Sequence, residues 1–131
     1  MFPDRGRNVS TARTMPGKWH VNLSFPGEAA KSYVVALSAA GTRPGVALPD
    51  GRRIQMNVDT LTALSINGLL APIFTGQAGK LNASGAGIAF IDARSLLPAA
   101  QGVRVWIVAV TFDGSASLGI ETISDPHLLI L

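Results

Sequence analysis

Three acidic residues near the C-terminus have side chains that could bind a metal ion. Asp113, Glu121 and Asp125 fall in or beside turn-rich segments, and carboxylate oxygens on loops are ligands that Ca²⁺ prefers. Their spacing does not match the calcium loop of an EF-hand, so a calcium site here is a hypothesis without a motif. Apart from it we expect no metal or cofactor, because the chain has no cysteine and two histidines, too few for the usual zinc sites.

Catalysis is not indicated by any residue pattern in the sequence. The chain lacks the Gly-x-Ser-x-Gly nucleophile elbow, the phosphate-binding loop and the His-Glu-x-x-His zinc motif. We interpret both histidines as structural, because His20 falls on the polar side of a predicted strand and His127 follows Pro126. We therefore expect no enzyme, and a hydrolase that uses loop carboxylates stays as a lesser alternative.

Aromatic side chains bear on carbohydrate binding, because a sugar ring stacks on an accessible aromatic face. Trp19 and Trp106 lie on apolar faces of predicted strands, so we interpret both as core residues. Phe2, Phe25 and Phe74 are the rings left free. These rings give little support to sugar binding, and it is the predicted fold class that makes an extracellular carbohydrate-binding module the alternative interpretation of the chain.

The elements that would position these residues are short strands separated by turns. Both faces of residues 103–112 are apolar, which predicts a central strand buried on both sides. Residues 60–66 fit either a helix capped by Asp59 or a strand. We favour the strand, because Thr and Ser are weak helix formers and Asn67-Gly68 follows at once. The other predicted strands are residues 19–25, 31–39, 54–58, 73–81, 87–93, 119–123 and 127–131.

About eight strands at this spacing predict an all-β fold, an immunoglobulin-like antiparallel β-sandwich over residues 18–131. The chain of 131 residues is long enough for one such domain, and its 47% hydrophobic content excludes global disorder. No stretch reaches the about 18 consecutive apolar residues of a membrane span. The predicted core residues are Trp19, Val21, Tyr33, Val35, Leu37, Ile54, Met56, Ile88, Phe90, Val105, Trp106, Ile107, Val108 and Leu128.

Residues 1–17 are predicted to form a basic N-terminal arm or linker outside the sandwich. Together with Lys18 they carry four basic side chains against Asp4, a net charge of +3 that equals the charge of the whole chain. A neutral body with a basic arm is poor evidence for nucleic-acid binding. We expect the arm to contact a neighbouring protein, with a phenylalanine as anchor and arginines pairing with acidic or carbonyl groups. These interaction residues are Phe2, Arg5, Arg7 and Arg13.

The order of several segments along the chain can be compared with that of known protein families. These segments are the run 33–38, the Gly-Thr-x-Pro-Gly loop at 41–45, Leu48-Pro49-Asp50-Gly51, an apolar run with Asn57 and Asp59, Phe74-Thr75-Gly76, the glycine-spaced run 79–85, and the run 120–125 ahead of Leu128-Leu129-Ile130. This order resembles an uncharacterised C-terminal β-sandwich module of exported proteins from planctomycete-like bacteria, over about residues 18–131. The resemblance implies an extracellular or cell-surface location and supplies no catalytic residues.

The leading interpretation is a non-enzymatic structural or protein-interaction module. It would bind a protein partner or a second copy of itself, through the N-terminal arm or an unpaired edge strand. Residues 1–17 lack the apolar stretch of an export signal. We accordingly expect either a cytoplasmic chain or a piece of a longer exported protein.

Overall fold

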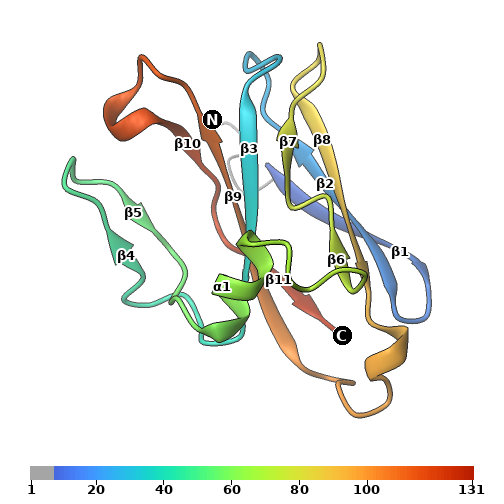
Figure 1. The fold of residues 1–131 in the computed structure, drawn as a ribbon. Coiled ribbons are helices and arrows are strands. Elements are labelled where there is room, and N and C mark those ends of the chain that lie inside the picture. The colour runs from blue at the N-terminus through green and yellow to red at the C-terminus, as the bar shows by residue number, and fades with distance from the viewer. Residues whose placement is uncertain (1–7) are drawn as a thin grey trace, which may run out of the picture.

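Alternating apolar and polar residues give this chain two antiparallel sheets that pack face to face (Figure 1). The computed structural model describes residues 8–131. Sheet A has the strand order β1-β2-β8-β6, and sheet B has the order β10-β9-β3-β7 with β11 also paired to β9. The strands are β1 (Val9–Met15), β2 (Lys18–Ser24), β3 (Ser32–Ser38), β4 (Val46–Ala47), β5 (Arg53–Ile54), β6 (Phe74–Thr75), β7 (Ala78–Lys80), β8 (Ala86–Asp92), β9 (Arg104–Phe112), β10 (Ile120–Ile123) and β11 (His127–Ile130). The helices are α1 (Thr60–Ile66) and two short 3-10 turns, η2 (Arg94–Leu96) and η3 (Ser117–Gly119).

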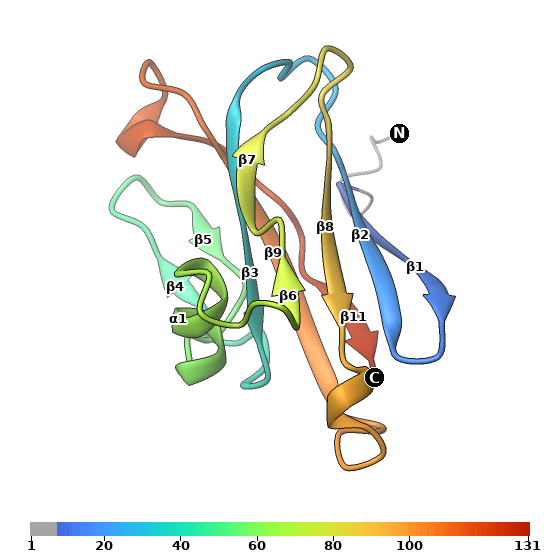
Figure 2. The same ribbon diagram turned by 45° about the vertical axis from the view of Figure 1, so that its right-hand side comes forward.

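The main core lies between the two sheets, as the period-2 pattern predicts. In β2, Val21 and Leu23 point inward, and in β3 Val35 and Leu37 meet them from the opposite sheet. The β4–β5 hairpin stands outside this pair of sheets, on the far side of sheet B, as both ribbon views show (Figures 1 and 2). The all-β sandwich prediction is thus confirmed.

Strand β9 is the central strand that its apolar faces predict. It pairs with β3 along one edge and with β10 and β11 along the other. Val105, Ile107 and Ala109 face the main core. The alternate residues, among them Val108 and Val110, face the opposite side of sheet B, beneath the β4–β5 hairpin.

Part of the predicted core is wrong, most clearly in β8. Ile88 and Phe90 are exposed, and Ala89 and Ile91 face the core in their place. The reason is the ring of Tyr33, which lies against Gly87 so closely that a Cβ there would approach it to 3.0 Å. A glycine therefore takes the inward position 87, and the alternation along β8 then turns Ile88 and Phe90 outward and Ala89 and Ile91 inward. Three further predicted core residues, Ile54, Trp106 and Leu128, are only half-buried. Conversely, the prediction that Phe25 and Phe74 are free rings is wrong, because each is 1% exposed and belongs to the core.

The strand predicted for residues 60–66 is also wrong, because this segment forms helix α1. The Asp59 side chain accepts a hydrogen bond from the Thr62 backbone N–H at 3.0 Å, and the Thr62 hydroxyl accepts one from the Asp59 N–H. This reciprocal capping box stabilises the first turn. Ser65 then presents its hydroxyl to the Leu37 N–H of β3 at 3.0 Å. Local capping and this tertiary bond outweigh the weak helix propensity of the segment.

The boundary predicted at Lys18 is wrong for residues 9–15. These residues form β1, which pairs with β2 in the register Val9↔Leu23 to Arg13↔Trp19. Val9 is 1% exposed and belongs to the core. Pro16 and Gly17 are typical of a linker, which is why the sequence does not predict a strand before them. In the structure Gly17, at φ +87°, belongs to the tight turn that joins β1 to β2.

A pair of Val→Ala substitutions tests whether β1 is part of the core. Val9→Ala should lower the free energy of unfolding by about 2 kcal/mol, because it removes buried methyl groups and leaves a cavity. Val103→Ala is the control, since Val103 is 41% exposed in a loop and its loss should have little effect. Urea denaturation measures both. Equal, small effects would show that β1 does not contribute to the core.

Candidate functional site

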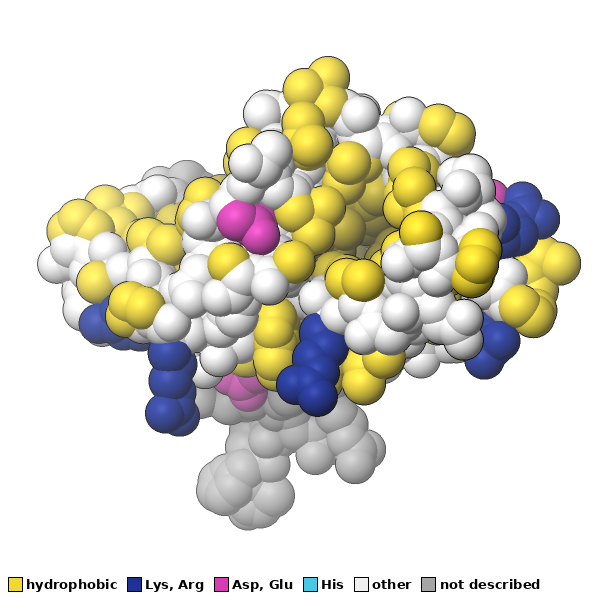
Figure 3. Space-filling view, turned by 90° about the horizontal axis from the view of Figure 1, so that it is seen from below, with side chains coloured by type: hydrophobic (Ala, Val, Ile, Leu, Met, Phe, Trp, Pro, Cys, Tyr) yellow, Lys and Arg dark blue, Asp and Glu magenta, His cyan; other side chains and the backbone are white. Residues whose placement is uncertain are grey.

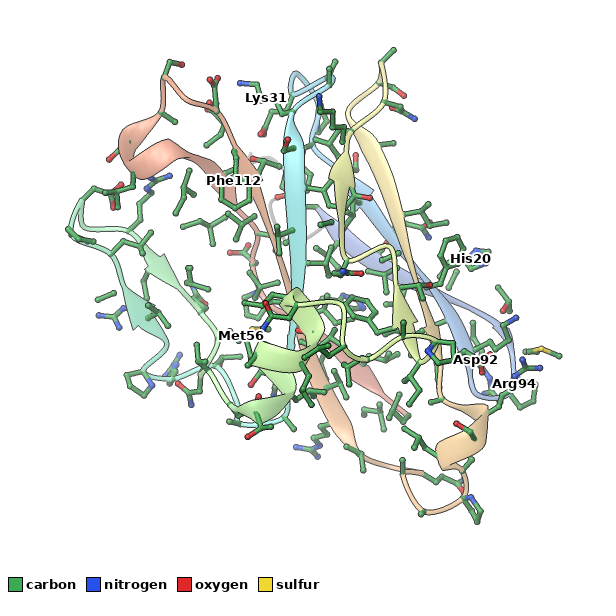
Figure 4. The ribbon with its side chains drawn as sticks, in the orientation of Figure 1. His20, Lys31, Met56, Asp92, Arg94 and Phe112 are labelled. Atoms are coloured by element: carbon green, nitrogen blue, oxygen red, sulfur yellow. The ribbon has the colours of Figure 1, made fainter. Side chains whose placement is uncertain are left out.

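The predicted calcium ligands do not form a metal site. Asp113 and Glu121 come together, but on the ammonium group of Lys31, which lies 2.5 Å and 3.3 Å from their carboxylate oxygens. Figure 4 shows Lys31 at the upper end of the molecule. Its hydrogen bond is the main reason why the pKa of Asp113 falls to about 2. A lysine already occupies the position between these carboxylates that a cation would need.

Asp125 does not join Lys31 in this ion pair, and it lines a polar groove between the β4–β5 hairpin and β10. The groove has a volume of about 400 Å³ and is also lined by Arg52, Arg53 and Glu121. Two guanidinium groups in its wall disfavour a metal cation. Within residues 8–131 no three acidic or histidine side chains are grouped closely enough to bind a metal.

Glu28, which no sequence pattern indicated, connects three segments at the same end of the molecule. Its carboxylate accepts hydrogen bonds from the hydroxyls of Thr111 and Thr122, and the Thr111 oxygen accepts the Thr122 N–H at 3.0 Å. These contacts join the loop after β2 to β9 and β10. No motif could have revealed them, because they depend on long-range pairing. The groups satisfy one another, as a structural network does.

The outer face of sheet A carries an exposed aromatic ring. Phe90 is 42% exposed, and the ring of His20 stands edge-on to it with centroids 5.2 Å apart. His20 points away from sheet B (Figure 4). A shallow pocket of about 280 Å³ at this place is bordered by Lys18, Thr75 and Asp92 as well. Asp92 pairs with Arg94, whose hydrogen bond lowers its pKa to about 2.

The second histidine has a structural position, in agreement with its interpretation. The Nε2 atom of His127 lies 3.0 Å from the hydroxyl of Thr11, so β11 and β1 are joined by side chains. Partial burial lowers the pKa of His127, which keeps the imidazole neutral near pH 7.

Strand β1 is an unpaired edge of sheet A over the described residues. The Ser24 N–H donates to the Asn8 carbonyl at 2.8 Å, and hydrogen-bonded pairs alternate along an antiparallel ladder. Ser10 and Ala12 therefore direct their backbone groups toward β2. The N–H and C=O groups of the intervening residues, Val9, Thr11 and Arg13, point away from the sheet.

Of the four predicted arm residues, the structure places one. Arg13 is exposed on β1. Phe2, Arg5 and Arg7 lie outside the described residues, so their predicted contacts stay predictions.

An apolar groove lies between the β4–β5 hairpin and the outer face of sheet B. It has a volume of about 450 Å³. Val34 and Ala36 of β3 and Val108 and Val110 of β9 line one side. Residues of the hairpin and α1 and the segments beside them line the other side, namely Val46, Ile54, Met56, Val58, Thr62, Ile66 and Asn67, and Phe112 and Ile120 complete the wall.

Polar contacts hold the hairpin in place at both of its ends. At the tip, the Arg52 guanidinium donates to the Ile120 carbonyl at 2.8 Å and to the Ser117 carbonyl at 2.9 Å, and it pairs with Asp50. Hydrogen bonds from Arg52 lower the pKa of Asp50 to about 2. At the base, the Asn57 side chain accepts from the Gly45 N–H at 2.9 Å and donates to the carbonyls of the loop before it.

The lower end of the molecule is apolar. Seen from below, hydrophobic side chains surround a hollow, and lysine and arginine side chains stand at the periphery (Figure 3). The loop that follows β8 lies at this end (Figure 1). It contributes the exposed side chains of Leu96 and Val103.

Comparison with known proteins adds no functional assignment. No family model, curated protein or solved structure matches this chain. In the part of the chain that the structure describes, no helix has the length and apolar character needed to cross a bilayer.

The Lys31 ion pair predicts a pH dependence. In Lys31→Met the pKa of Asp113 should rise from about 2 toward its ordinary value of 3.8, because the hydrogen-bonded ammonium is gone. The folded-state pKa is depressed, so the ion pair stabilises the fold above pH 3.8, and this contribution is lost as the pH falls toward 2. NMR titration of the carboxyl carbons measures the shift, and Lys80→Met, on exposed β7, is the control. An unmoved Asp113 pKa would contradict the pairing.

Proposed function

We propose that this chain is a non-enzymatic interaction module that associates with a second copy of itself through the free edge of β1. The observation that carries the proposal is the seven-residue length of this edge, whose outward N–H and C=O groups can pair with another strand. An immunoglobulin-like classification and an extracellular or cell-surface setting belong to the same proposal.

The remaining sheet edges are less suited to pairing. Strands β6 and β7, which end the two sheets on one side, have two and three residues, and β11, which ends sheet B beside β9, has four. At β10, the Ile120 carbonyl already accepts a hydrogen bond from Arg52. Where β3 continues past the end of β7, the Ser65 hydroxyl of α1 accepts a hydrogen bond from the Leu37 N–H. Such coverings protect edges against association, and they leave β1 as the longest available edge of the described residues.

Side chains on β1 are compatible with an antiparallel pair of identical strands. If two copies pair about Ala12, Ser10 lies opposite Thr14, and Arg13 lies opposite Thr11 of the other copy. The arginines of the two strands then do not face one another, so like charges are kept apart. The side chains of Ser10, Ala12 and Thr14 alternate with Thr11 and Arg13 along β1. They are small, exposed and uncharged, so they do not obstruct the approach of a second sheet edge.

Two substitutions at one position test this edge. Arg13→Pro removes an N–H that points away from β2, and proline is tolerated at such positions of an edge strand. Arg13→Ala keeps that N–H and removes the same charge. We expect light scattering to give a dimer mass for the parent and for Arg13→Ala, and a monomer mass for Arg13→Pro with an unchanged melting temperature. A monomeric parent chain, or a dimeric Arg13→Pro, would contradict the proposal.

Carbohydrate binding is the second candidate, and the exposed ring of Phe90 is the observation that favours it. The ring stands beside polar side chains that could hydrogen-bond sugar hydroxyls, among them Asp92 and Lys18. Phe90→Ala should abolish any retardation of the protein in gels that contain soluble xylan or β-glucan. Phe112→Ala, which removes an exposed ring from the other sheet, should leave it unchanged. Migration unaffected by either polysaccharide would exclude these ligands.

A further inference from the structure

We infer that the apolar groove beneath the β4–β5 hairpin is a binding site for an uncharged small molecule with a hydrocarbon body. This site is separate from the β1 edge, because it lies on the outer face of sheet B, whereas β1 belongs to sheet A. Its volume of about 450 Å³ falls within the usual range of small-molecule sites.

The wall of the groove selects the chemistry of the occupant. No charged side chain lines it, and Thr62 and Asn67 are the polar residues among those that do. The Thr62 hydroxyl already bonds with Asp59, and the Asn67 amide nitrogen donates to the Ala63 carbonyl at 2.9 Å. A charged ligand would lose its hydration without compensation. An uncharged hydrocarbon loses nothing and buries apolar surface.

Polar contacts keep the groove from closing. A hairpin over an apolar sheet face would normally collapse onto it, since cores are close-packed. Here Arg52 at the tip is bound to the carbonyls of Ser117 and Ile120. At the base, the Ser38 hydroxyl of β3 donates to the Asn57 carbonyl at 2.6 Å. These two anchors fix the distance between the hairpin and the sheet, so the space between them is built into the fold.

Exposed apolar side chains mark the entrance. Val58 is 64% exposed, and Ile66 and Phe112 are exposed as well, although all three line the groove. Phe112 lies on the side of β9 that faces the hairpin (Figure 4). An apolar molecule could pass between these residues from solvent and cover them on binding. A site beneath a two-stranded cover suits a small molecule better than the broad, flat contact that a protein partner requires.

The uncharged probe N-phenyl-1-naphthylamine tests the site, because its fluorescence rises in apolar surroundings. We expect saturable binding of one probe per chain. Ala36→Leu fills the floor of the groove and should weaken binding by about tenfold or more. Ala78→Leu adds the same side chain to exposed β7 and should leave binding unchanged.

A second variant keeps the test decisive if Ala36→Leu fails to fold. Val58→Asp places a carboxylate at the exposed rim, where it cannot disturb the core, and should also weaken probe binding. Val103→Asp adds the same charge at the lower end and is its control. Absence of binding to the parent, or binding that survives both groove variants, would overturn the inference. If the probe bound at the lower apolar end instead, both groove variants would still bind it, and the inference would be overturned.

Discussion

The burial of β9 on both of its faces is the constraint on which the rest of the structure depends. One face joins the core between the two sheets, and the other needs a separate cover. Sheet A supplies the first partner. The β4–β5 hairpin, with Met56 and α1, supplies the second. A strand with two apolar faces cannot leave either one in water without a large loss of hydrophobic stabilisation, so the 39–67 segment must fold across sheet B.

Buried hydroxyl groups complete the sheet where strands end or change partners. Ser124 accepts the Ala109 N–H of β9 at 2.8 Å, in the gap between β10 and β11, and Ser65 does the same for β3. Thr111 connects β9 to Glu28. Every buried side-chain polar atom of residues 8–131 has a partner, as is usual in native proteins. These short side chains satisfy backbone groups of β3 and β9 where a neighbouring strand is missing, whereas β1 keeps an unpaired edge.

Much of the fold follows from the sequence, because strand alternation and turn residues are local signals. The paired strands β2, β3, β8 and β9 lie close to their predicted ranges. Local signals failed where a distant residue decides the outcome: Tyr33 sets which face of β8 turns inward, and Leu37 supplies the bond that favours α1. The site was less predictable still. Lys31 neutralises the expected calcium ligands, and the groove exists only because the hairpin, α1 and sheet B meet.

Amide hydrogen exchange tests most directly whether β9 is the centre of the fold and the hairpin a separate cover. The amides of residues 105–111 should exchange only through global unfolding. The amides of residues 46–54 should exchange at least about 100-fold faster, through local opening of the hairpin. Exchange of β9 as fast as that of the hairpin would contradict the central place of this strand, and equally slow exchange of both would contradict the description of the hairpin as a separate cover.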